Sequence, residues 1–147
     1  MTIRSVREND AARIADLNTQ LGYPSLEAQV ATRINMLAAS AHDTILVAAA
    51  GDDQAVGWVH VRGFNSLHGD PIAEICGMVV DAGHRSHGVG TQLIAAAEEW
   101  ARSRDFGSMR VRSNAIRKDA HRFYERVGFQ LTKTSLTFQK RVDLSRL

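Results

Sequence analysis

Apolar residues recur along this chain with the periods of both helices and strands. Ile14, Leu17 and Leu21 lie three and four residues apart, which predicts an amphipathic helix over residues 11–21. The same spacing predicts further helices over residues 26–37, from Gly90 to about residue 104, and over 118–127. Alternating or β-branched runs predict strands at residues 2–6, 44–50, 55–62, 72–81, 109–113, 129–132 and 135–139.

The resulting order is β-α-α-β-β-β-α-β-α-β-β. It indicates an α/β fold of mixed (α+β) character, with a single mixed six- to seven-stranded sheet and helices on both faces. Gly77, inside the fourth strand, predicts a bulge that splays this strand from a neighbour and opens a cleft.

Composition narrows the class of protein. A length of 147 residues, with 44% apolar and 23% charged residues, indicates one soluble globular domain over residues 1–147. No apolar run approaches the ~20 residues that span a bilayer, and the first residues lack a signal-peptide core. A single cysteine excludes an intramolecular disulfide framework. Together, these three observations predict a cytoplasmic protein that does not bind a membrane. The net charge of +2 is too small to indicate a nucleic-acid partner.

The stretch over residues 75–100 reads as a strand, a polar turn with glycines and then a helix. Its turn, from Arg85 to Gly90, has the form R-x-x-G-x-G. Glycines at the start of a helix let a ligand approach backbone N–H groups that have no partner within the helix, which suits a pyrophosphate. A plain glycine-containing turn is the alternative. Neither the nucleotide P-loop nor the G-x-G-x-x-G fingerprint is present.

Two blocks of this sequence resemble the GNAT N-acetyltransferase superfamily. Val79-Val80-Asp81, followed by R-x-x-G-x-G and a Leu/Ala-rich helix, is similar to its acetyl-CoA-binding signature. Residues 113–129 are similar to its second signature. The resemblance covers nearly the whole chain, most firmly residues 72–138, and implies an acetyl-CoA-dependent N-acetyltransferase.

Acetyl transfer to an amine needs a neutral amine, an oxyanion donor and a proton for the leaving thiolate. An alkyl amine has a pKa of about 10.4, so its deprotonation at pH 7 costs roughly 4–5 kcal/mol. By the resemblance, Glu74 is the candidate base, acting directly or through water, and Tyr124 the candidate acid; a salt-bridged glutamate and a packed aromatic ring are the alternatives. Alternation puts Glu74, Cys76 and Met78 on one side of the strand unless the bulge changes the phase.

The resemblance also implies a cofactor site. The amide of Met78 or Val79 is the expected oxyanion donor, the amides from Arg85 to Gly90 bind the pyrophosphate, and Asn114 contacts the cofactor arm. The full set expected to bind acetyl-CoA is Met78, Val79, Val80, Arg85, Ser86, His87, Gly88, Val89, Gly90, Thr91, Asn114, His121 and Phe123.

Two other kinds of chemistry are disfavoured by the sequence. Cys76 is interpreted as a buried strand cysteine rather than a nucleophile. The histidines fall on different predicted elements without an H-x-x-x-H pair, so no metal site is expected.

The run over residues 113–124 looks like the branch that holds aminoalkylphosphonate and small aminoglycoside-type acetyltransferases. This implies a small-molecule primary amine as acceptor, with Tyr23, Arg33, Asn35 and Met36 on the paired N-terminal helices as candidate contacts. The alternatives are a non-catalytic acyl-CoA-binding or sensor module and a protein lysine or N-terminal acetyltransferase. Because superfamily members often pair through terminal strands, a homodimer is also an expectation.

Overall fold

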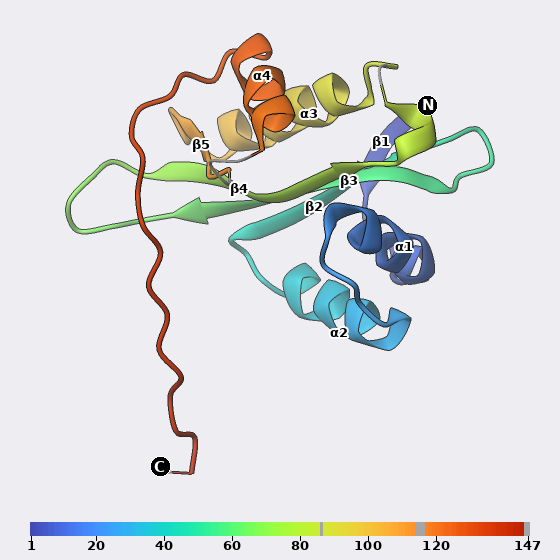
Figure 1. The fold of residues 1–147 in the computed structure, drawn as a ribbon, viewed down its shortest axis with the longest axis horizontal. Coiled ribbons are helices and arrows are strands. Elements are labelled where there is room, and N and C mark those ends of the chain that lie inside the picture. The colour runs from blue at the N-terminus through green and yellow to red at the C-terminus, as the bar shows by residue number, and fades with distance from the viewer. Residues whose placement is uncertain (86, 114–116, 146–147) are drawn as a thin grey trace.

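The computed structural model describes residues 1–85, 87–113 and 117–145 (Figure 1). Its centre is a five-stranded sheet in the order β1-β2-β3-β4-β5. The first four strands are antiparallel and β5 is parallel to β4, so the sheet is mixed as predicted. The strands are β1 Thr2–Ser5, β2 Asp43–Ala49, β3 Ala55–Phe64, β4 Ile72–Val80 and β5 Met109–Val111.

Helices cover both faces of the sheet, which confirms the predicted layering. One face carries α1 (Ala11–Leu21) and α2 (Glu27–Ala38), and the other carries α3 (Val89–Ser103) and α4 (Lys118–Arg126) (Figure 1). Two short 3-10 turns, η1 Glu8–Asp10 and η2 Ala82–His84, precede α1 and α3. Within the described residues, no helix has the length and apolar content needed to cross a bilayer.

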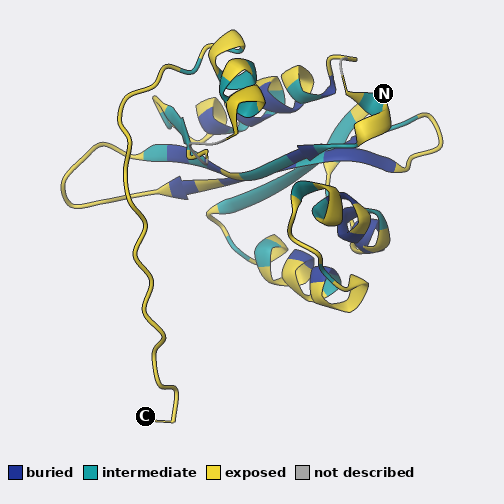
Figure 2. Cartoon of the chain, viewed as in Figure 1, coloured by how far each residue is buried: buried dark blue, intermediate teal, exposed yellow. Residues whose placement is uncertain are grey.

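The alternation of side chains along β3 divides the core into two layers. Val59 and Val61 pack with Leu93 and Ile94 of α3, whereas Trp58 faces the layer under α1 and α2. Burial follows the sheet and the inner faces of the helices (Figure 2). Since successive strand residues point to opposite faces, His60, which lies between these two valines, points to the face that carries α1 and α2.

The prediction of six to seven strands is wrong for the described residues. Residues 129–132 and 135–139 form no strand, and the last part of the chain runs away from the body in extended form (Figure 1). Leu131, Leu136 and Phe138 are 82%, 82% and 87% exposed. Alternating apolar residues indicate a chain suited to pairing, but they do not specify the strand with which it pairs.

A buried ion pair fixes the start of α1 to the edge of the sheet. Both oxygens of Asp10 accept hydrogen bonds of 2.8 Å from the guanidinium of Arg4, and Oδ2 also accepts one of 2.7 Å from the backbone N–H of Arg7. Burial opposes ionisation of Asp10, but these bonds outweigh it and lower the pKa of the carboxyl. The pair therefore holds α1, whose far end reaches the functional site, in a defined position.

Candidate active site

A bulge in β4 shapes the site. Val61 of β3 pairs with Ile75 and the preceding His60 pairs with Gly77, so Cys76 is the extra residue. A Cβ at Gly77 would lie 2.9 Å from the ring of Trp58, a distance that leaves no space for a side chain. The bulge predicted at this glycine is therefore confirmed.

The bulge also changes the phase of alternation. Glu74 pairs with Arg62 on the face that carries α1 and α2, whereas Met78 pairs with Val59 and packs into the layer under α3. Glu74 and Met78 therefore lie on opposite faces of β4. Because β4 pairs with β5 only from Ala73 to Ile75, its second half leaves β5 and borders a cleft.

The turn after β4 presents backbone donors. Gly88 has a φ of 78°, in the left-handed region that favours glycine, and α3 begins at the next residue. The first intrahelical bond runs from the N–H of Gln92 to the carbonyl of Gly88 at 3.0 Å. The N–H groups of Val89, Gly90 and Thr91 thus belong to the first turn, which favours anions through both its donors and its dipole.

Gln20, at the end of α1, anchors this turn. Its Nε2 donates to Asp81 Oδ1 at 2.8 Å and its Oε1 accepts from the N–H of Ala82 at 2.9 Å. Hydrogen bonds from Gln20 and then from His84 lower the pKa of Asp81 to about 2. Sequence reasoning missed Gln20, because no local pattern relates it to a turn about sixty residues away.

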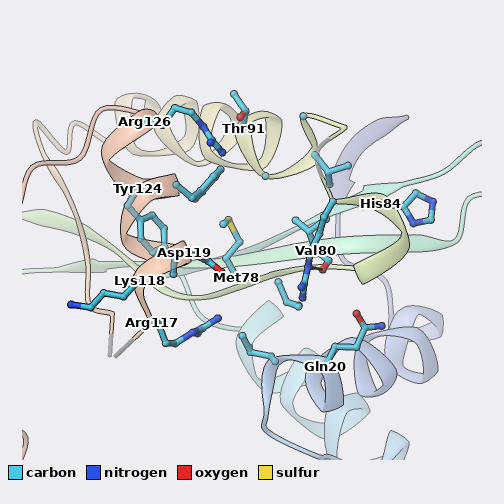
Figure 3. A pocket seen from close by; sticks show the side chains of 18 residues that line it. Gln20, Met78, Val80, His84, Thr91, Arg117, Lys118, Asp119, Tyr124 and Arg126 are labelled. Carbon is cyan, nitrogen blue, oxygen red and sulfur yellow. Dashed lines mark hydrogen bonds between the residues drawn. The ribbon is translucent and has the colours of Figure 1, made fainter. Parts of the chain in front are cut away.

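A cleft of about 710 Å³ lies between β4, α3 and α4 (Figure 3). It brings together ten of the residues predicted for the site, namely Met78, Val79, Val80, Arg85, Gly88, Val89, Gly90, Thr91, Phe123 and Tyr124. The other lining residues are Gln20, Leu21, His84, Arg117, Lys118, Asp119, Ala120 and Arg126. Among them, only the basic charges of Arg117 and Lys118 gave a signal in the sequence, one that suits a solvated surface equally well. The surplus of basic over acidic side chains suits a ligand rich in phosphate.

Other predicted residues lie elsewhere. His87 and His121 do not line the cleft, and Glu74 points to the opposite face of the sheet. Ser86 and Asn114 lie outside the described residues. The suggested acceptor contacts on the N-terminal helices, Tyr23, Arg33, Asn35 and Met36, do not line it either.

Tyr124, the candidate acid, lines the cleft. Its ring makes edge contacts with Phe123 and Phe129, with centroids 5.5 and 5.8 Å away. Burial raises the pKa of the phenol, and the positive charge of Arg117 opposes part of this rise. The phenol is consequently protonated at neutral pH and able to donate a proton.

Glu74 lies in an ion pair on the other face. Its Oε1 is 2.7 Å from Arg110 Nε and 3.4 Å from Arg112 Nε, and its side chain is 13% exposed. Cys76 is exposed rather than buried, so that part of its interpretation is wrong. Desolvation of the thiol and the negative charges of Glu74 and Asp43 nevertheless raise the pKa of Cys76 to about 11, so it is not a thiolate at neutral pH.

The chain matches the Acetyltransferase (GNAT) family over residues 11–129. It belongs to this family. An aminoglycoside N(6')-acetyltransferase of Stenotrophomonas maltophilia is 29% identical, over 98% of this chain and 95% of its own. An aminoalkylphosphonate N-acetyltransferase of Salmonella typhimurium is 40% identical over 46% of this chain and 44% of its own. The solved aminoglycoside N-acetyltransferase AAC(6')-Iy in complex with CoA shares the fold, with a TM-score of 0.84 and 21% identity over 96% of this chain and 95% of that one.

As a GNAT N-acetyltransferase, the protein uses acetyl-CoA as its acetyl donor. The cleft has the chemistry that this molecule requires. The first-turn N–H groups of α3, together with Arg85, suit a pyrophosphate, and the apolar sides of Met78 and Phe123 suit a less polar arm.

Replacing Gly88 by alanine tests the anion site. No atom lies within 4 Å of the added Cβ, so the change adds strain at a positive φ without a clash. We expect the first turn of α3 to reorient and the Kd for acetyl-CoA, measured by calorimetry, to rise at least about fivefold.

Gly51→Ala is the matched control, because Gly51 is also surrounded by open space but has no left-handed φ. Equal acetyl-CoA affinity in the two variants would show that the conformation of residue 88 does not matter for binding.

Proposed function

We propose that this protein transfers acetyl directly from acetyl-CoA to the primary amine of a small molecule. The observation that carries the proposal is the position of Tyr124, a half-buried and protonated phenol in the same cleft as Met78 and the first turn of α3. An acid in this place suits the departure of a thiolate. The aminoglycoside and aminoalkylphosphonate acetyltransferases among its relatives support a small-molecule acceptor.

Each step of the reaction is assigned to a group of this chain. The amine nitrogen first bonds to the acetyl carbon, and the bond from that carbon to sulfur then breaks. The backbone N–H of Met78 or Val79 stabilises the oxyanion between these events. The proton lost by the amine passes to Glu74, directly or through water, and Tyr124 gives a proton to the thiolate sulfur.

The raised pKa of Cys76 favours direct transfer over an acetyl-cysteine intermediate. A thiol with a pKa of about 11 is almost wholly protonated at pH 7, and only the thiolate is an effective nucleophile. Cys76 is likewise not among the residues that line the cleft, so it is unsuited to a relay from it.

Replacing Tyr124 by phenylalanine tests the assigned acid. The ring contacts remain while the proton donor is lost, so kcat should fall about 10²–10⁴-fold, with an unchanged Kd for acetyl-CoA. The rate is followed as thiol release with acetyl-CoA and a primary amine. Tyr23→Phe is the control, since Tyr23 is 70% exposed and lies outside the cleft.

An unchanged rate in the Tyr124 variant would contradict the role of the phenol. Binding of acetyl-CoA without turnover of any small amine would instead favour an acyl-CoA-binding module. Turnover of a lysine peptide alone would favour a protein acetyltransferase.

We also propose that residues 130–145, termed the C-terminal arm, join two copies of the chain. The arm exposes Leu136 and Phe138 on alternate positions, as a strand does. β5 is the last strand of the sheet, and a second cleft of about 850 Å³ lies beside it, lined by β5, Phe106 and residues near Val127. An exposed apolar arm and an open strand edge are complementary, because the edge offers hydrogen bonds and the cleft receives side chains.

Light scattering of the full chain tests the arm. We expect a dimer, and expect the double change Leu136→Asp with Phe138→Asp to give mainly monomer, because two charges enter the apolar contact. Gln139→Asp, at a neighbouring position of opposite alternation, should leave the dimer intact. A monomeric wild-type protein would contradict the proposal.

A further inference from the structure

Three arginines lie around Glu74 on the face of the sheet that carries α1 and α2. Arg62 of β3 is opposite Glu74 in the antiparallel register, and Arg110 is opposite it in the parallel register of β5. Arg112 comes two residues later and approaches the same carboxylate oxygen at 3.4 Å. These residues, Arg62, Arg110 and Arg112, are termed the arginine cluster.

The arginine cluster is not neutralised by the carboxylates around it. Asp43, also on this face, has a side chain that is 1% exposed. Its Oδ2 accepts a hydrogen bond of 2.6 Å from the hydroxyl of Ser40, and its Oδ1 lies 2.6 Å from His60 Nε2. If both Glu74 and Asp43 are counted as negative charges, the three arginines leave a net charge of +1 on this part of the face. If Asp43 is left out because it is already bound to Ser40 and His60, the net charge is +2.

The packing of the cluster concentrates this charge. The guanidinium carbons of Arg62 and Arg110 both lie over the ring of Phe64, at 5.8 and 5.6 Å from its centroid. Contact with a ring stabilises each cation, but two guanidinium groups on one ring also repel each other. An added anion between the arginines would relieve that repulsion.

Arg112 is the member best placed to contact an acceptor. Its side chain is 67% exposed, whereas that of Arg110 is 32% exposed. The last pair of the β4–β5 register joins Ile75 to Val111, so Arg112 is the first residue after the point where the two strands part. Met78 is three residues beyond Ile75 along β4, about 10 Å at the rise of an extended chain. An arginine side chain and a short amine together cover such a span.

We propose that the acceptor is a primary amine that also carries an oxyanion, a phosphonate, phosphate or carboxylate, which the arginine cluster binds through Arg112. This inference rests on the proposed function. Guanidinium groups match oxyanions in shape and charge, and bind them through paired hydrogen bonds. A polycationic acceptor meets like charges here, because the arginines outnumber the nearby carboxylates.

A panel of acceptors with the full-length protein tests the proposal. The amines are 2-aminoethylphosphonate, β-alanine, 1-aminopropane and kanamycin, each assayed by thiol release from acetyl-CoA at low salt. We expect the highest kcat/KM with one of the two anionic amines, and the choice between them distinguishes a phosphonate site from a carboxylate site. A higher kcat/KM for kanamycin or for 1-aminopropane would overturn the inference.

The change Arg112→Gln tests the assigned contact. Loss of a charge-assisted bond should raise the KM of the preferred anionic amine at least about tenfold and leave that of 1-aminopropane unchanged. Arg7→Gln is the matched control, because Arg7 is 54% exposed and pairs with exposed Asp53 in the turn before β3, outside both clefts. An equal KM for the anionic amine in wild type and the Arg112 variant would contradict the contact.

A binding measurement separates this inference from the proposed activity. Propylphosphonate has the anion but no amine, so calorimetry reports the site without turnover. We expect binding to the wild type and at least tenfold weaker binding to the Arg112 variant. Such binding without turnover of any amine would support the anion site and contradict the proposed activity. Equal binding by both proteins would overturn the inference, whatever the turnover.

Discussion

The bulge at Cys76 and Gly77 is the constraint on which the rest of the site depends. It lets one strand serve two faces, because Glu74 lies on the side of α1 and α2 while Met78 lies on the side of α3. It also coincides with the point where β4 leaves β5, so the cleft opens at the same residues. The contact between Gly77 and the ring of Trp58 enforces this geometry, since any side chain at residue 77 displaces the ring. Donor and acceptor can thus approach one strand from opposite faces.

The distribution of charge matters more than the total. The net charge of the chain is only +2, yet basic side chains gather at two places. These are the cleft proposed for the phosphates of acetyl-CoA and the face proposed for the anionic group of the acceptor. Arg85, Arg117 and Lys118 line the cleft, and the arginine cluster lies on the opposite face. Acidic groups near both places are engaged, Asp81 with Gln20 and His84, and Glu74 with arginines. Positive potential at both faces steers anionic ligands toward the same strand.

Local patterns predicted most of the fold and many of the residues that line the cleft. The period of Ile14, Leu17 and Leu21 identified α1, and the glycines after β4 identified the start of α3, because these features are properties of a few consecutive residues. The catalytic roles of Glu74 and Tyr124 stay predictions. The sequence did not reveal that Gln20 bonds the turn or that Arg110 and Arg112 share Glu74, since such partners are set by how distant segments pack. The C-terminal strands failed for the same reason: alternation indicated extended chain but named no neighbour.

The most direct test of the account is to follow the backbone amide signals of the protein by nuclear magnetic resonance while CoA is added. We predict that the largest shifts fall on Val89, Gly90 and Thr91, with further shifts at Met78 and Val79, because these residues line the cleft. Shifts confined to the arginine face or to the C-terminal arm, with the first turn of α3 unaffected, would contradict the placement of the cofactor.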